Sequence, residues 1–126
     1  MTILIVDDFA PVRNSLKRLL SSIHGIDLMA EAADGYEAQE MIRTLKPDVL
    51  ILDIQMPVKS GMDLLKECAG NLEGTTVIVL TAYTTPELRQ QCLTLGAEYV
   101  LDKAMEFQRV PEIITKVARA KWDTSR

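Results

Sequence analysis

Residues 49–52 read VLIL, four branched aliphatic side chains in a row, and Asp53 follows them directly. An unbroken run of this kind is typical of a strand that is buried on both faces, as in a parallel sheet. Comparable runs are ILIV at 3–6, VIVL at 77–80 and YVL at 99–101. Because parallel strands all end at the same edge, we expect the polar residues that follow these runs to meet there.

The residues at the ends of these runs are charged or polar. They are Asp7, Asp8, Asp53, Thr81 and Lys103. Neighbouring strands lie about 4.8 Å apart, so four strand ends span only about 15 Å. Carboxylates brought this close repel each other unless a positive charge joins them. The sequence therefore predicts a site for a divalent cation and an anionic group, in which Thr81 and Lys103 also take part.

Length and composition indicate one globular domain. The chain has 126 residues, of which 48% are hydrophobic and 25% charged, which is ordinary for a domain with its own core. Its net charge of -4 argues against direct nucleic-acid binding, which needs a basic surface. No apolar run approaches the roughly 20 residues of a membrane span, so we expect no membrane insertion. Cys68 and Cys92 lack CxxC spacing and are expected to be buried, reduced thiols of a cytoplasmic protein.

Strand and helix patterns alternate five times along the chain. Strands are expected at 2–7, 27–32, 48–53, 76–81 and 98–102, and helices at about 10–24, 36–46, 61–68, 86–95 and 106–121. This alternation predicts an α/β fold, a three-layer α/β/α sandwich around a five-stranded parallel sheet. The second strand ends in Ala32-Ala33 without a reactive group, so we place it at an edge and expect the flavodoxin-like order 2-1-3-4-5. The domain should cover 1–122, with a polar tail at 123–126.

Several residues are expected to mark helix ends. Gly25 should end the first helix in a left-handed conformation, and Pro47 should stop the second. Ser60 and Thr85 are placed to cap the third and fourth helices, and Pro86 suits the first position of the fourth.

Four segments in this order resemble the receiver domain of two-component response regulators, the CheY-like family. They are LIVDDF (4–9), LILDIQMP (50–57), VLTA (79–82) and YVLDKA (99–104). Each segment alone is a weak signal, but four of them, each closing a strand at the spacing of five strand–helix units, are specific. The resemblance covers Thr2 to about Lys121 and implies a stand-alone receiver.

The resemblance implies a phosphoacceptor and a metal site. Asp53 matches the phosphorylated residue of the family. Asp8 matches a direct Mg²⁺ ligand, and Asp7 a residue that acts through a bound water. The main-chain carbonyl of Gln55 would be a further ligand, which fits a hard cation that takes oxygen ligands.

The remaining site residues match positions that contact the phosphoryl group or respond to it. Thr81 would donate its hydroxyl to a phosphoryl oxygen. Lys103 would pair with another phosphoryl oxygen and, before phosphorylation, with Asp53. Tyr99 matches an aromatic position whose rotamer changes with phosphorylation, and a half-buried strand aromatic is the alternative interpretation.

The chemistry is coherent without the family name. A carboxylate attacks a phosphoryl group poorly because both are anionic. Mg²⁺ and Lys103 would neutralise the entering oxygens, so that Asp53 can attack in line. The product would be an acyl phosphate, which hydrolyses readily and therefore suits a transient signal.

The resemblance also implies how the chain signals. It would not be a turnover enzyme, because it would catalyse only phosphoryl transfer onto itself and its own dephosphorylation. The donor would be a phosphohistidine of a sensor histidine kinase or phosphotransfer protein. Phosphorylation would reshape the surface built from the helix at 86–95, the strand at 98–102 and the helix at 106–121. A downstream protein would read this surface, or the chain would dimerise through it.

Two positions depart from the family or bear on its kinetics. Receivers usually have proline after the conserved lysine, with a cis peptide before it, whereas Ala104 follows Lys103 here. The loop therefore either keeps a costly non-proline cis bond or takes a trans path. Tyr83, two residues beyond Thr81, is hypothesised to border the path of attacking water and to slow hydrolysis of the acyl phosphate.

Two alternative functions stay open at this point. A pseudo-receiver would bind partners without phosphorylation, but it would be favoured only if an acid or the lysine were missing. An aspartyl-phosphate phosphatase of the haloacid dehalogenase type would need a second Asp two residues after the nucleophile, where this chain has Gln55.

Overall fold

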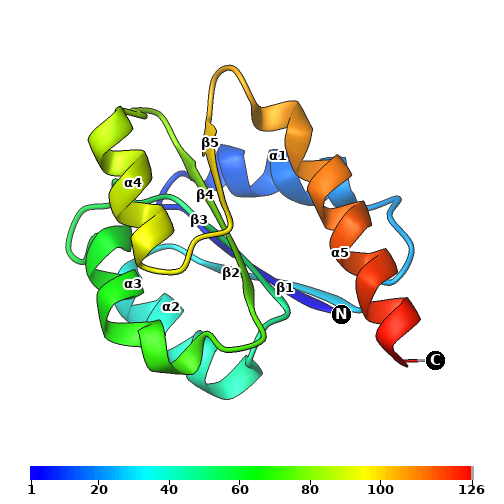
Figure 1. Ribbon diagram of the computed structural model, residues 1–126. Coiled ribbons are helices and arrows are strands. Elements are labelled where there is room, and N and C mark those ends of the chain that lie inside the picture. Colours follow the sequence, from blue (N-terminus) through cyan, green and yellow to red (C-terminus); the bar gives the residue numbers. More distant parts are fainter. Residues whose placement is uncertain (126) are drawn as a thin grey trace.

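The computed structural model describes residues 1–125, with side chains to Trp122, and shows strands and helices in alternation (Figure 1). The elements are β1 (Thr2–Val6), α1 (Ala10–Leu20), β2 (Leu28–Ala32), α2 (Gly35–Leu45), β3 (Val49–Leu52), α3 (Gly61–Cys68), β4 (Thr76–Thr81), α4 (Pro86–Thr94), β5 (Tyr99–Asp102) and α5 (Val110–Ser125). Two short 3-10 turns, η1 (Ala69–Asn71) and η2 (Phe107–Arg109), follow α3 and precede α5. Each expected strand and helix is present, which confirms the predicted α/β class.

The strands form one parallel sheet in the order β2-β1-β3-β4-β5, as the sequence predicted. Val6 pairs with Leu52, Leu52 with Val79, and Thr81 with Asp102. β1 and β3 therefore end level with each other, and β4 and β5 run two residues further, so that the residues that follow these four strands leave the sheet at one edge.

Helices cover both faces of the sheet. α1 and α5 lie on one face, and α2, α3 and α4 lie on the other (Figure 1). Successive residues of β1 alternate between the two cores: Ile3 and Ile5 pack on the side of α1 and α5, and Leu4 and Val6 on the opposite side. All four are at most 1% exposed, which confirms that the apolar runs are strands buried on both faces.

α1 ends earlier than expected. Its last residue is Leu20 rather than residue 24. The hydroxyl of Ser21 donates to the Arg18 carbonyl at 2.8 Å, and the Ser21 N–H donates to the same oxygen at 3.3 Å. These local hydrogen bonds replace the next helical ones. Gly25 does have a left-handed φ of 98°, but it lies in the turn beyond the helix, so the prediction that it ends α1 was wrong.

α5 is shifted toward the C-terminus. It begins at Val110, after η2, and continues to Ser125. Residues 123–125, expected in a tail, therefore prolong the helix, whereas Arg126 lies outside the described residues. Pro111 is tolerated in the first turn because the N–H that it lacks has no partner there. No Gly or Pro follows Pro111, so nothing in the sequence stops the helix earlier.

The other predicted helix ends are confirmed. The Ser60 hydroxyl accepts a hydrogen bond from the Asp63 N–H at 3.1 Å, and the Thr85 hydroxyl accepts one from the Leu88 N–H at 3.1 Å. α2 ends just before Pro47, where Lys46 adopts a left-handed φ of 47°.

The cysteines lie in the core. Cys68 and Cys92 are both buried and unbridged, in agreement with the expected free thiols. Burial raises the pKa of each thiol, which lowers its reactivity. Within residues 1–125, no helix combines the length and the apolar character that crossing a bilayer would require.

Candidate functional site

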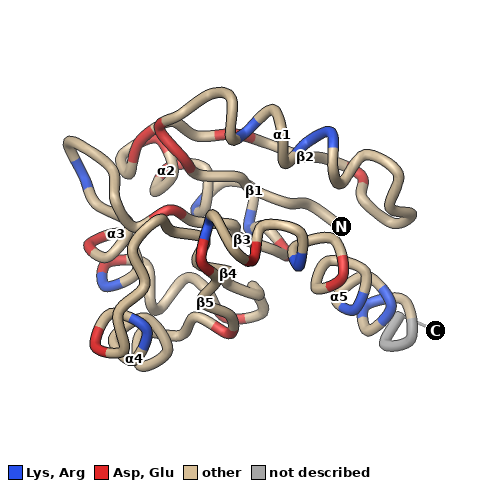
Figure 2. Tube along the Cα trace, turned by 90° about the horizontal axis from the view of Figure 1, so that it is seen from above, with Lys and Arg blue, Asp and Glu red and all other residues tan. Residues whose placement is uncertain are grey.

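The residues predicted to meet do lie together at the carboxyl edge of the sheet, which Figure 2 shows from above. Asp7 follows β1, Asp53 follows β3, Thr81 ends β4, and Lys103 follows β5. The main-chain ladder extends into this edge: the Asp53 N–H donates to the Val6 carbonyl at 3.0 Å, and the Lys103 N–H donates to the Thr81 carbonyl at 2.8 Å. The site is therefore attached to the rigid sheet at two strand ends.

Three carboxylates form a cluster at this edge. Asp7, Asp8 and Asp53 each bring an oxygen within 4.8 Å of the others. Asp7 is 3% exposed and Asp53 6%, whereas Asp8 is open to solvent. A set of carboxylate oxygens with one accessible side fits a hard divalent cation, which takes oxygen ligands and keeps some of its water.

Lys103 joins two of these acids. Its Nζ lies 2.6 Å from Oδ2 of Asp7 and 3.0 Å from Oδ2 of Asp53. Burial alone would lower the pKa of Lys103, but hydrogen bonds and attraction from both carboxylates outweigh this effect, and the pKa is raised. Lys103 therefore stays protonated. Its single charge does not balance three carboxylates, so the cluster still attracts a cation.

Each buried acid also uses its other oxygen. Oδ1 of Asp7 accepts a hydrogen bond from the Phe9 N–H at 2.8 Å, and Oδ1 of Asp53 accepts one from the Gln55 N–H at 2.9 Å. These bonds to the main chain two residues further on are Asx turns, which orient the carboxylates. Lys103 thus pairs with the second oxygen, Oδ2, of each acid.

Thr81 has a buried hydroxyl without a partner. The residue is fully buried, and Oγ1 makes no hydrogen bond within the described part of the chain. An unsatisfied buried hydroxyl costs about 1–3 kcal/mol. This cost at the edge of an acidic cluster is explained if the hydroxyl donates a hydrogen bond to an oxygen of a ligand that binds at the cluster.

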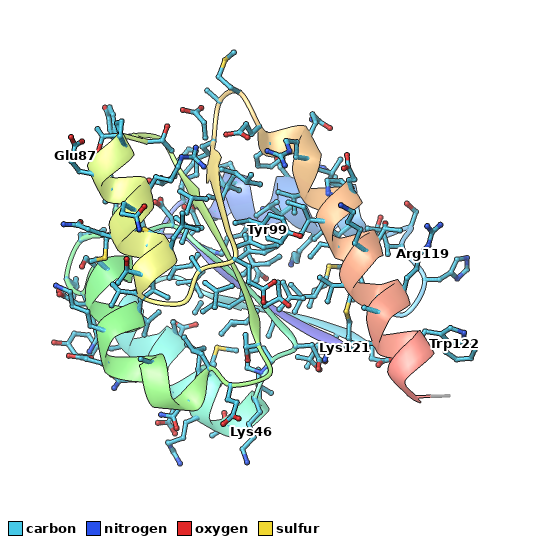
Figure 3. All side chains as sticks on the ribbon, viewed as in Figure 1. Lys46, Glu87, Tyr99, Arg119, Lys121 and Trp122 are labelled. Carbon is cyan, nitrogen blue, oxygen red and sulfur yellow. The ribbon has the colours of Figure 1, made fainter. Side chains whose placement is uncertain are left out.

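The remaining predicted residues lie near this edge in different ways. Gln55 follows Asp53 by two residues, and its side chain is exposed. Its role as a carbonyl ligand stays a prediction. Tyr99 starts β5 and packs, half-buried, against the core on the side of α5 (Figure 3). Its role in switching also stays a prediction, because a half-buried ring fits both a switching residue and an ordinary strand aromatic.

Gly61, which the sequence analysis did not single out, lies against the site. A Cβ at Gly61 would come within 2.5 Å of the Asp53 carbonyl oxygen and 2.5 Å of the Ile54 Cα. No side chain can occupy that space. α3 therefore begins directly on the main chain of Asp53, and only glycine permits this approach.

Comparison with known proteins agrees with this geometry. The family described as response regulator receiver domain matches residues 3–115. The chain belongs to this family. The match covers β1 from Ile3 onward, the other four strands and the whole acidic cluster, so the resemblance seen in the sequence and the CheY-like architecture are confirmed.

Individual proteins are similar to this receiver in sequence or in structure. Chemotaxis protein CheY of Thermotoga maritima is 33% identical over 117 residues, covering 93% of this chain and 97% of its own. Protein-glutamate methylesterase/protein-glutamine glutaminase 5 of Myxococcus xanthus is 34% identical over 131 residues, but the match covers only 38% of that protein. The response regulator domain of Thermotoga maritima CheB superposes with a TM-score of 0.82 and 32% identity, covering 95% of each chain.

This receiver departs from the family pattern in the loop after Lys103. None of the described peptide bonds is cis, so the bond between Lys103 and Ala104 is trans. Oδ1 of Asp102 accepts hydrogen bonds from the N–H groups of Ala104 and Met105, both at 2.9 Å. A proline at residue 104 could not donate the first of these bonds. The carboxylate of Asp102 thus organises the loop after Lys103.

Asp102 was missed by the sequence analysis. Its Oδ2 accepts a hydrogen bond from the Thr84 hydroxyl at 3.3 Å, and its N–H donates to the Glu106 carboxylate at 3.0 Å. It therefore connects the loop after Thr81 with the loop that carries Lys103. The only signal in the sequence was an Asp at the start of a loop. An Asp there can accept hydrogen bonds from main-chain N–H groups further along the loop, as in an Asx turn.

Proposed function

We propose that this receiver accepts a phosphoryl group on Asp53 from a phosphohistidine of a sensor kinase or phosphotransfer protein. The observation that supports this best is the surroundings of one carboxylate. Asp53 has acidic neighbours within 4.8 Å, the ammonium of Lys103 at 3.0 Å, and the unpartnered hydroxyl of Thr81 at the end of the next strand. Together these groups offer a nucleophile, a cation site and donors for phosphoryl oxygens.

The cation would be Mg²⁺. Asp8, Asp53 and the Gln55 carbonyl would hold it, and Asp7 would act through a water molecule. When bound, Mg²⁺ supplies positive charge that lets two anions approach each other. The exposure of Asp8 leaves this side of the cluster open to ions and to a phosphodonor.

In the transfer step, an oxygen of Asp53 would form a bond to phosphorus while the bond from phosphorus to the imidazole nitrogen breaks. The electron pair of that bond would stay on this nitrogen, and because the other ring nitrogen carries a proton, the leaving group is a neutral imidazole. Lys103 would move its hydrogen bonds to a phosphoryl oxygen. Thr81 would donate its hydroxyl to another, which would satisfy a group that is otherwise buried without a partner.

Switching would follow from the same contacts. Movement of Thr81 toward the phosphoryl group would shift the loop between β4 and α4 and leave space for Tyr99 to turn inward. The surface of α4, β5 and α5 would then change, and a downstream protein or a second copy of the chain would bind it. This scheme requires only local electrostatics and one bistable loop.

The comparisons support a coarser statement about activity. Receivers are generally not turnover enzymes, and the match to the methylesterase covers only part of that protein. We therefore propose that this receiver catalyses only its own phosphorylation and dephosphorylation, in the cytoplasm, without direct nucleic-acid contact. The phosphatase alternative lacks its second acid, because residue 55 is Gln. The pseudo-receiver alternative is disfavoured, because the acids and Lys103 are all present in one cluster.

Mass spectrometry after incubation with Mg²⁺ and acetyl phosphate tests the proposal. The wild type should gain one phosphoryl group, and Asp53→Asn should gain none. Asp63→Asn, which removes an exposed acid on α3, is the matched control and should behave as the wild type. A wild type that gains no phosphoryl group would leave the pseudo-receiver as the better interpretation. If the wild type is phosphorylated, pull-downs with beryllium fluoride and Mg²⁺ would identify partners of the phosphorylated form.

A further inference from the structure

One buried charged residue lies outside the cluster described above. Among the described residues, the buried polar or charged side chains are Asp7, Asp53, Thr81 and Lys59. The first three belong to the site. Lys59 is 8% exposed and lies in the loop between β3 and α3. Burial of an ammonium group is costly unless it is paired, so its contacts indicate why it is there.

The ammonium of Lys59 joins this loop to two helices. It forms an ion pair with Glu67 of α3, and it donates a hydrogen bond to the amide oxygen of Gln39 of α2 at 3.1 Å. It also lies 5.0 Å from the ring centroid of Tyr36 of α2, within range of a cation–π interaction. One side chain from the loop thus contacts both helices beside it.

The side-chain stem and the main chain of Lys59 also pack closely against α2. A Cβ at Gly35, the first residue of α2, would come within 2.6 Å of Lys59 Cγ and 2.7 Å of the Lys59 carbonyl oxygen. No other residue type fits at that position without displacing the loop. The start of α2 therefore packs directly against the side chain and main chain of Lys59.

The residue before Lys59 is strained. Val58 has a left-handed φ of 68°, which is disfavoured for a β-branched side chain, and it is 82% exposed. Its own side chain therefore makes few contacts that could hold this conformation. Strained residues persist where the surroundings determine them, and the neighbouring contacts of Lys59 provide that constraint.

The loop held in this way is the one that carries the phosphoacceptor. It starts at Asp53, includes Gln55, and is closed by a hydrogen bond from the Gly61 N–H to the Ile54 carbonyl at 3.1 Å. Only a few residues separate Lys59 from Asp53 and Gln55. A displacement at Lys59 would therefore move the main chain on which the carboxylate and the Gln55 carbonyl depend.

We propose that Lys59 is a positioning residue for the metal site: its contacts with Glu67, Gln39 and Gly35 hold the β3–α3 loop so that Asp53 and the Gln55 carbonyl are aimed at a divalent cation. The inference rests on the proposed function and names the residue that prepares its metal site. Lys59 does not touch the reacting atoms. It acts through the path of the loop.

Lys59→Met provides the sharpest test, because positioning and simple electrostatics predict opposite results. Loss of a positive charge near the site would by itself strengthen Mg²⁺ binding. If Lys59 positions the loop, the variant should instead bind Mg²⁺ about tenfold more weakly, the size seen when residues that orient metal ligands are changed. The measurement is the Mg²⁺ dissociation constant by titration calorimetry on the full chain. Lys66→Met, an exposed lysine on α3, is the matched control and should bind as the wild type.

A second variant covers the case in which Lys59→Met does not fold. Glu67→Gln leaves the stem of Lys59 in place and should also weaken Mg²⁺ binding, and by more than Glu73→Gln, which removes an exposed acid elsewhere. Phosphorylation by acetyl phosphate should need more Mg²⁺ in Lys59→Met and in Glu67→Gln than in the wild type. At saturating Mg²⁺, both variants should approach the wild-type rate. A merely structural role would lower the melting temperature and leave the dissociation constant unchanged.

The outcomes separate this inference from the proposed function. Unchanged Mg²⁺ affinity in folded Lys59→Met, or in Glu67→Gln, would overturn the role of Lys59 even if the wild type is phosphorylated normally. A wild type that binds Mg²⁺ but takes up no phosphoryl group would contradict the proposed function, while the calorimetric comparison would still decide the role of Lys59.

Discussion

The ammonium of Lys103 lies 2.6 Å from a carboxylate oxygen of Asp7, although their strands, β5 and β1, are separated in the sheet by β3 and β4. Lys103 thus reaches along the edge from β5 to β1, and it lies closer to Asp7 than to Asp53, which is 3.0 Å away. The contact makes Lys103 a resident cation of the acidic cluster. An incoming metal ion would have to share Asp7 with it.

Removal of the Lys103 charge should therefore make the protein depend more on metal. Lys103→Met leaves Asp7 and Asp53 buried without their cation, and loss of one partner of such a pair costs about 3 kcal/mol. We expect a lower melting temperature without metal and a larger rise on addition of Mg²⁺ than in the wild type. Phosphorylation should be impaired even at saturating Mg²⁺. A smaller Mg²⁺ effect on the melting temperature than in the wild type would contradict this role.

The same contacts predict a dependence on alkaline pH. The pKa of Lys103 in the folded protein is raised above its usual value of 10.5. The stabilisation from its charge is therefore fully present below pH 10.5 and is lost as the pH rises through the folded-state pKa. Urea denaturation above that pH should show a steeper loss of stability in the wild type than in Lys103→Met. Equal slopes would mean that the ion pairs contribute little.

Thr81→Val should separate stability from function. Valine has nearly the same shape and lacks the unsatisfied hydroxyl, so the free energy of unfolding should rise by about 1 kcal/mol. Phosphorylation or its effect on the α4–β5–α5 surface should weaken, because no hydroxyl is left to donate to a phosphoryl oxygen. Chemical denaturation and phosphate uptake measure the two effects. Thr81→Ala, which leaves a cavity instead, should lower stability, and a destabilised valine variant would imply a hydrogen bond that the hydroxyl makes in solution.

The carboxylate of Asp102 should matter for the loop that carries Lys103. Asp102→Ala removes the acceptor for two main-chain N–H groups and for the hydroxyl of Thr84. We expect a loss of about 1–3 kcal/mol in urea denaturation. Thr84→Val removes only the longest of these bonds and should cost less. If both variants are as stable as the wild type, contacts other than those of Asp102 must hold the loop that carries Lys103.

Tyr83 is expected to influence the lifetime of the acyl phosphate. Its side chain is 67% exposed in the loop that follows β4, close to Thr81 in the chain. If its ring borders the path of attacking water, Tyr83→Ala should shorten the half-life of the phosphorylated form and leave the uptake rate nearly unchanged. Decay after removal of acetyl phosphate measures this half-life. An unaltered half-life would show that the ring does not limit access of water.

The sheet and the main site could be predicted from the sequence because both depend on local patterns. The run at 49–52 and its counterparts identify buried strands, and the polar residue after each run must lie at the shared edge. Strand order followed from the lack of a reactive group after β2. These inferences use only chain direction, hydrophobicity and the residue that follows each run, which the sequence records directly.

Contacts that depend on how loops fold could not be predicted in the same way. Lys103 was expected to reach Asp53, but its contact with Asp7 depends on side-chain length and on the twist of four strands. Lys59 is an ordinary loop lysine in the sequence, and only the packing of α2 and α3 reveals that it is buried. Similarly, Ser21 ended α1 early through local bonds that the apolar pattern does not contain.

Gly61 sets a strict limit on how this protein can vary. Because α3 starts on the main-chain carbonyl of Asp53, even a methyl group at residue 61 would push the first turn of that helix and the main chain of Asp53 apart. Gly61→Ala should therefore disturb phosphorylation, although the change adds no charge and removes no metal ligand. In a library of variants selected for signalling, we expect few or no replacements of Gly61 to survive.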